Sequence, residues 1–166
     1  MSVAKIDLVK LESDFAQLER QGVRYRLGGK APSMSCEPAK IKSIDCSGYV
    51  RWALARASNQ KLIIPDGSQM QREWAEKNLR EVKYSDAAAY MTDKRLFIAF
   101  IKPFARNCGN IGHVWLLARY NDGNNGTKAG TMESHGGRGA NSRDWNYRTL
   151  IREVYSCWEI ETVQND

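Results

Sequence analysis

One cysteine and two histidines are the residues of this sequence best suited to chemistry. Cys46 lies in the stretch Asp-Cys-Ser-Gly at residues 45–48, directly before a segment that predicts a helix. The unpaired N–H groups at a helix start favour a thiolate and can hold a developing oxyanion. His113 and His135 are the only 2 histidines among 166 residues. A thiol nucleophile needs a base and a group that orients this base, so the three residues are a candidate catalytic set.

Each histidine opens or ends a predicted strand, with a polar loop between the two strands. Adjacent antiparallel strands would bring both side chains close together. One alternative is a buried structural cysteine with two unrelated histidines. Another is a zinc site formed by Cys46, His113 and His135, but the sequence has no CxxC or HxxxH ligand pair. We therefore expect no metal and no cofactor.

The first half of the chain predicts helices that would position the cysteine. The expected segments are residues 3–21, 49–57, 68–78 and a short Ala-rich stretch capped at 85–86. Gly22 ends the first of them. The second directly follows Cys46 and has an apolar face, so it should be central. Ser68 and Gln71 fit a capping box at the start of the third.

The second half predicts strands. Their expected ranges are 96–101, 113–118, 131–135 and 156–160, with a hairpin loop at 121–130. Helices followed by an antiparallel meander indicate an α+β fold. The length suits one domain over residues 1–166, and we expect a monomer.

The composition narrows the class of partner. The net charge is +6 and the pI about 9.2, which suits an anionic partner such as a cell-wall polymer. The basic residues are scattered, which argues against nucleic acid. No apolar run of membrane-spanning length occurs, so stable membrane association is not expected. The N-terminus lacks the apolar region of a signal peptide, so we expect synthesis in the cytoplasm.

The remaining cysteines leave the redox state open. Cys36, Cys108 and Cys157 would allow at most one disulfide if Cys46 is a free nucleophile. The sequence does not indicate which pair would form it. Reduced thiols are the default for a chain without a secretion signal.

Five segments in order resemble the NlpC/P60 family of cysteine peptidases. They span residues 25–137: Tyr-Arg-Leu-Gly-Gly-Lys at 25–30, Ile-Asp-Cys-Ser-Gly-Tyr-Val at 44–50, Ile-Pro-Asp-Gly-Ser-Gln-Met-Gln at 64–71, Gly-His-Val at 112–114 and Ser-His-Gly-Gly at 134–137. Each segment is weak alone, and their common order makes the resemblance specific.

The resemblance implies a papain-like α+β core, with the nucleophile helix packed on an antiparallel sheet. By motif position, Cys46 would be the nucleophile, His113 the base and His135 the residue that orients the base. Tyr25, Asp45 and Ser47 would bind substrate. The family mostly cleaves peptidoglycan stem peptides, often between D-glutamate and diaminopimelate, and we expect the same reaction here.

The sequence also departs from the family pattern. Leu27 replaces a tryptophan, Asp66 an arginine and Trp115 a small residue, while the loop at 30–44 is longer than usual. These changes concern the shape of the groove rather than the triad.

A compact catalytic domain of this kind resembles amidase effectors of type VI secretion. That resemblance implies an antibacterial toxin with an immunity protein, exported by a non-Sec route to the periplasm of a target cell. A phage-type lysin is one alternative. The others are a thiol acyl-transferase or hydrolase acting on a different amide, and a non-catalytic binding module that keeps the fold.

Overall fold

A computed structural model describes residues 2–90, 94–102, 110–121, 127–147 and 154–163. In these ranges the helices are α1 (Leu8–Gln21), α2 (Cys46–Ala57), α3 (Ser68–Asn78) and α4 (Tyr84–Tyr90), with a 3₁₀ turn at Pro38–Lys40. The strands are β1 (Arg80–Val82), β2 (Leu96–Ile101), β3 (Val114–Asn121), β4 (Thr127–Met132), β5 (Ser134–His135), β6 (Gly139–Ala140) and β7 (Val154–Ile160). The α+β prediction is confirmed.

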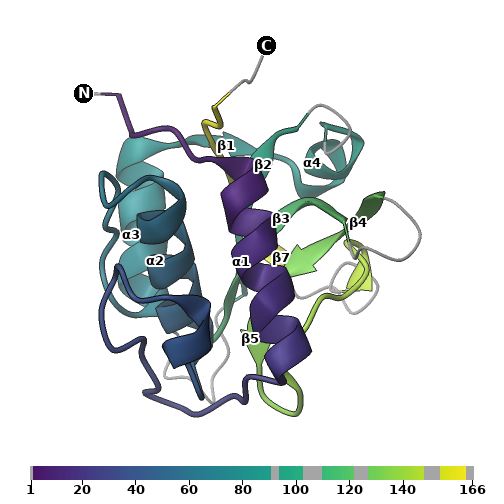
Figure 1. The fold of residues 1–166 in the computed structure, drawn as a ribbon. Helices are drawn as coiled ribbons and strands as arrows, with labels where there is room; N and C mark the ends of the chain where they lie inside the picture. The colour runs from purple at the N-terminus through teal and green to yellow at the C-terminus, as the bar shows by residue number, and fades with distance from the viewer. Residues whose placement is uncertain (1, 91–93, 103–109, 122–126, 148–153, 164–166) are drawn as a thin grey trace.

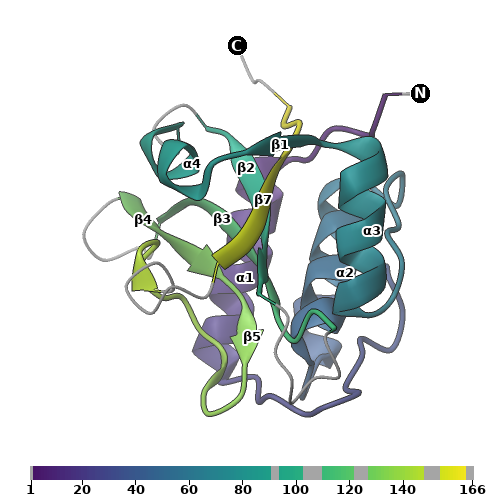
Figure 2. The same ribbon diagram turned by 180° about the vertical axis from the view of Figure 1, so that it is seen from behind.

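The main sheet is antiparallel and has the order β1-β7-β2-β3-β4, while β5 and β6 form a separate pair. The expected meander holds for β2, β3 and β4, but the last expected strand, β7, lies between β1 and β2 rather than beside β4 (Figure 2). Every residue of β2 is buried, so its backbone N–H and C=O groups are shielded from water and need hydrogen-bonding partners at both edges. Ile98 pairs with Leu116 of β3 and with Trp158 of β7.

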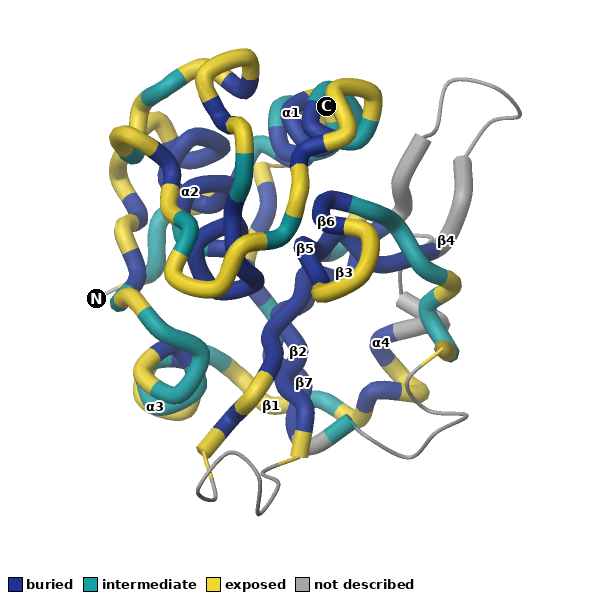
Figure 3. Tube along the Cα trace, turned by 90° about the horizontal axis from the view of Figure 1, so that it is seen from below, coloured by how far each residue is buried: buried dark blue, intermediate teal, exposed yellow. Residues whose placement is uncertain are grey.

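Helix α1 lies in front of the sheet in Figure 1 and behind it in the opposite view of Figure 2, so it covers one face. Helix α2 packs beside α1 and against β3. The buried parts of these elements meet in a single core, drawn dark blue in Figure 3. Phe15 of α1 packs on Tyr49 of α2 with ring centroids 5.5 Å apart. Arg56 pairs with Asp14 at 2.8 Å and joins the same two helices.

The limits of α1 differ from those expected at one end only. Gly22 ends the helix with φ 64°, a left-handed conformation that glycine adopts at low cost. The helix begins at Leu8 rather than at residue 3, because Asp7 caps it by accepting a hydrogen bond from the N–H of Lys10 at 3.1 Å. Before this cap, Ile6 is extended and bridges to Thr162.

The capping box expected at α3 is wrong. Gly67 is the N-cap, and no side chain caps the helix. The Ser68 hydroxyl donates instead to the carbonyl of Ile111. The Gln71 amide donates to the carbonyls of Ser47 and Pro65 at 2.9 and 3.0 Å. Both side chains thus fasten α3 to its neighbours.

The observed strands lie where the sequence predicts them, but several of them differ in length from the prediction. The segment expected at 96–101 is β2, and that expected at 156–160 lies within β7. The segment expected at 131–135 is divided between β4 and β5. Of the hairpin loop, residues 122–126 lie outside the described part of the chain. The short strands β1 and β6 were not predicted.

Two further expectations concern the membrane and the cysteines. No helix in the described ranges is both long enough and apolar enough to cross a membrane. Cys36, Cys46 and Cys157 are free thiols, and Cys108 lies outside the described residues.

Candidate active site

Cys46 is the first residue of α2, and its surroundings are fixed by the backbone around it. Asp45 is the N-cap and accepts a hydrogen bond from the N–H of Gly48 at 2.7 Å. A Cβ atom on Gly48 would lie 2.8 Å from both Asp45 Oδ1 and the carbonyl oxygen of Gly29. Only glycine therefore allows this close approach. The hydroxyl of Ser134 donates to the carbonyl of Ile44 at 2.7 Å and holds the segment before the cysteine.

The sulfur of Cys46 lies against the start of β3. The backbone N–H groups of Val114 and Ser47 lie close enough to the thiol to act on its pKa. Val114 directly follows His113, so the structure brings the candidate nucleophile to the backbone beside the candidate base. Burial raises the pKa of Cys46 to about 11, although the two N–H groups and Lys30 act to lower it. The resting cysteine at neutral pH is therefore a thiol, and the helix start does not by itself make a thiolate.

His113 is held by a carboxylate that the sequence analysis missed. Its Nε2 lies 3.0 Å from Oε1 of Glu133, and the Glu133 side chain is fully buried. Glu133 lies between β4 and β5 and accepts a backbone hydrogen bond from Asn141. The imidazole also stacks on Trp115, with centroids 5.7 Å apart and planes 21° apart.

His135, the expected orienting residue, has other contacts. Its Nδ1 lies 2.8 Å from Nη2 of Arg143, and its Nε2 lies 3.2 Å from Nε of the same guanidinium. Further contacts go to the carbonyl of Gly136 and the side chain of Asn141. The side chain in contact with His113 Nε2 is thus Glu133, two residues earlier. An acidic residue inside the strand expected at 131–135 was the signal for it.

The predicted substrate-binding residues Tyr25, Asp45 and Ser47 line the same pocket as Cys46. This open pocket has a volume of about 560 Å³. Its other walls are formed by residues 27–28, Lys30, residues 66–68 and residues 110–112. Burial, and then the nearby Cys46 and Asp45, raises the pKa of Tyr25 to about 12. The phenol keeps its proton at neutral pH and is available as a donor.

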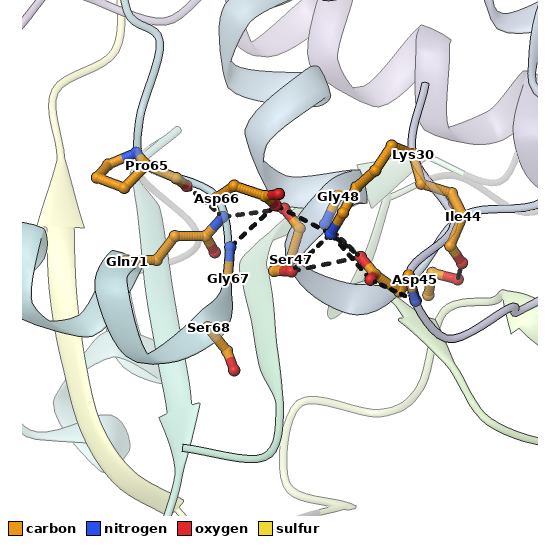
Figure 4. A network of polar contacts seen from close by, with 12 residues as sticks. Lys30, Ile44, Asp45, Ser47, Gly48, Pro65, Asp66, Gly67, Ser68 and Gln71 are labelled. Carbon is orange, nitrogen blue, oxygen red and sulfur yellow. Dashed lines mark hydrogen bonds and ion pairs between the residues drawn. The ribbon is translucent and has the colours of Figure 1, made fainter. Parts of the chain in front are cut away.

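A lysine that the sequence analysis left without a role joins two walls of this pocket (Figure 4). The ammonium of Lys30 lies 2.9 Å from both oxygens of Asp45, 2.9 Å from Asp66 and 3.3 Å from the Ser47 hydroxyl. Asp66 is the residue that stands in place of the family's arginine. Its carboxylate thus meets a lysine from the opposite wall.

The zinc alternative finds no support in the geometry. Within the ranges that the structure describes, no three His, Cys, Asp or Glu side chains are grouped to hold a metal ion.

The fold has relatives among known proteins. The described elements form a papain-like α+β core with a cysteine at the start of a helix packed on an antiparallel sheet. The NlpC/P60 family model matches residues 22–95, which include Tyr25, Cys46 and the segment up to β2. Over these residues, just under half of the chain, the sequence is similar to the NlpC/P60 family.

Two solved structures show the same fold. A Staphylococcus aureus protein of the NLP/P60 family, similar to a lipoprotein, aligns with a TM-score of 0.61 and 17% identity, over 99% of this chain and 45% of that one. NlpC1 from Trichomonas vaginalis aligns with a TM-score of 0.56 and 15% identity, over 99% and 49%. The chain thus spans about half the length of these two proteins. A search of curated protein sequences found no match.

Proposed function

We propose that this protein is a cysteine peptidase or amidase that hydrolyses amide bonds in peptidoglycan stem peptides. One observation carries the proposal. The Cys46 thiol lies beside the backbone N–H of Val114, directly after His113, and lines an open pocket, while the His113 ring is held by the buried Glu133. The match of the NlpC/P60 family model to residues 22–95 supports the substrate class. The bond between D-glutamate and diaminopimelate is the preferred candidate.

The reaction starts from the thiol, because burial holds the pKa of Cys46 near 11. Since Nε2 of His113 is engaged by Glu133, Nδ1 is the ring nitrogen that takes the thiol proton. The sulfur attacks the carbonyl carbon, and the proton passes from His113 to the leaving nitrogen as the C–N bond breaks. Water then hydrolyses the thioester, with His113 again as base, and restores the thiol.

Glu133 and Tyr25 have supporting roles in this proposal. Glu133 fixes the ring of His113 and stabilises the imidazolium that forms during attack, the part first expected of His135. The Tyr25 phenol lines the pocket and keeps its proton, since its pKa is about 12. It donates to the carbonyl oxygen of the scissile amide. Asp45 and Ser47 shape the adjoining wall.

Mass spectrometry of purified peptidoglycan fragments tests the proposal. The intact protein should release products shortened at one amide bond, and the product masses identify that bond. The Cys46→Ala protein should release none. Equal product formation by the Cys46→Ala protein would sink the proposal. Products joined to an added amine, without free acid, would instead favour the acyl-transferase alternative.

The biological setting is a separate proposal that rests on resemblance to compact type VI amidase effectors. We propose that the protein reaches the periplasm of a target cell by a non-Sec route and that an immunity protein blocks it. Bacteria expressing the chain in the cytoplasm should grow, and those expressing it with an added export signal should lyse. Lysis in neither case would contradict the toxin role. Release by lysing phage particles would favour the lysin.

A further inference from the structure

The ammonium of Lys30 is shared between two carboxylates that differ in how firmly they are held. Asp45 is buried, and besides Lys30 it accepts hydrogen bonds from the N–H of Gly48 at 2.7 Å and that of Gly28 at 3.1 Å. The Ser47 hydroxyl lies within 3.3 Å of the same carboxylate. Asp45 is therefore a fixed part of the start of α2, and it anchors the lysine.

Asp66 is held loosely by comparison. Its side chain is 52% exposed, and beyond Lys30 it accepts a hydrogen bond from the N–H of the adjacent Gly67. Burial acts to raise the pKa of Asp66, but the bond to Lys30 keeps it below its ordinary value. The carboxylate is thus ionised at neutral pH. Ion pairs of such exposed groups are easily exchanged, since solvent screens them.

We propose that Lys30 binds a carboxylate of the substrate beside the scissile amide, and that Asp66 occupies this place while the pocket is empty. Lys30 and Cys46 line the same pocket, and the lysine charge acts on the cysteine thiol. A carboxylate-bearing peptide replaces Asp66 at the ammonium, while Asp45 keeps the lysine in position. The inference rests on the proposed function in taking Cys46 as the reacting residue.

The opposite exchange is a ligand ammonium that displaces Lys30 from the two carboxylates. For this exchange, the Lys30 ammonium would have to give up its contacts with Asp45, Ser47 and Asp66 and leave the pocket. Exchange at Asp66 breaks one ion pair on the exposed side. The geometry therefore favours an anionic ligand group over a cationic one.

The preference of this site for an anionic group can be measured at Cys46 with two small alkylating agents. Iodoacetate and iodoacetamide have similar size and the same leaving group, but only iodoacetate carries a carboxylate. The quantity measured is the alkylation rate with iodoacetate divided by that with iodoacetamide, determined by peptide mass mapping at pH 9. Both reagents react with the same thiolate, so the thiolate fraction drops out of this ratio. We expect this ratio to be about fivefold higher at Cys46 than at the half-buried Cys36 of the same protein.

Three variants decide the source of the selection. Lys30→Met should lower the ratio at Cys46 to that at Cys36. Asp66→Asn should raise it above the wild-type value, because the resident competitor is gone. Lys42→Met removes an exposed lysine outside the pocket lining and should leave the ratio unchanged.

An unchanged ratio in Lys30→Met, or a fall in Asp66→Asn, would overturn the inference. So would faster reaction of Cys46 with the cationic 2-bromoethylamine than with iodoacetate, relative to Cys36. The measurement needs an accessible thiol but no hydrolysis. Selection of iodoacetate in a protein that leaves peptidoglycan intact would therefore contradict the proposed function and support the carboxylate site.

Discussion

Cys46 and Cys157 are both buried thiols, and burial raises the pKa of both, to about 11 and about 12. Cys157 lies within β7, where its backbone pairs with Ala99 of β2 and Val82 of β1. Cys46 starts a helix and lines an open pocket. Cys46 is 6% exposed and Cys157 1% exposed, so burial alone does not distinguish the two cysteines.

The difference lies in the groups that each sulfur can reach. A surface hollow also adjoins Cys157, but its described lining contains no histidine. Cys46 lies beside the backbone that carries His113, and Glu133 holds that ring. A raised thiol pKa therefore marks burial in both cases. A histidine next to the backbone that Cys46 adjoins, held by its own carboxylate, is what supports the proposed catalysis.

The sharpest test of this comparison replaces each cysteine by alanine. Cys46→Ala should reduce peptidoglycan hydrolysis at least about a thousandfold, because the nucleophile is lost. Cys157→Ala should keep the rate and lower only the melting temperature, since it removes packing inside the sheet. Initial rates of product release and thermal unfolding measure the two effects. A similar loss of rate in both variants would break the distinction.

The carboxylate behind His113 provides the second test. Glu133→Gln should lower kcat about 100-fold with little change in KM, because the imidazolium loses its counter-charge. Glu159→Gln is the matched control: that carboxylate pairs with Arg95 on the sheet and should leave kcat unchanged.

His135→Ala separates Glu133 from the residue first expected in its role. We expect a smaller loss of kcat than in Glu133→Gln, because the ring of His135 contacts Arg143. A larger loss in His135→Ala would restore the original triad. Steady-state kinetics on one defined stem peptide gives both values.

The pH dependence of alkylation is the third test. Below a pKa of about 11, the thiolate fraction of Cys46 rises about tenfold for each pH unit. The iodoacetamide rate at Cys46 should therefore still be rising between pH 8 and pH 10. Cys157, with a pKa of about 12 and 1% exposure, should react only after unfolding. A plateau for Cys46 near pH 7 would mean that the resting residue is a thiolate.

The smallest expected effect concerns the close packing of the backbone around Gly48, near Cys46. Gly48→Ala should lower the free energy of unfolding by about 1–3 kcal/mol, since the added Cβ meets Asp45 and the Gly29 carbonyl at 2.8 Å. Gly136→Ala, where no atom lies within 4 Å of the added Cβ, should be nearly neutral. Chemical denaturation of both variants measures the difference, and equal stabilities would contradict it.

Local signals predicted much of the fold and the position of Cys46 at the start of a helix. The apolar run of β2, the helix after Cys46 and the stop at Gly22 are each encoded in neighbouring residues. The place of β7 between β1 and β2 depends on pairings between residues far apart in sequence. Periodicity carries no information on such pairings.

The role of Glu133 was missed for a related reason. His135 completed a familiar motif order, whereas Glu133 is identified only by its 3.0 Å contact with His113. Lys30 and Asp66 were likewise noted as sequence features, but their ion pair joins segments 36 positions apart, as the numbers 30 and 66 show. The motifs pointed to Cys46, which lines the pocket, and left its polar neighbours Lys30 and Asp66 unassigned.

The insertion of β7 also has a kinetic consequence. Strand β2, whose side chains are all buried, gains its second partner only when residues 154–160 have been synthesised. Until then its free edge can pair with another chain. The nascent protein therefore completes its central sheet only after residues 154–160 have left the ribosome. Pairings over such separations are slow to form, so chaperone contact during synthesis should raise the yield of folded protein.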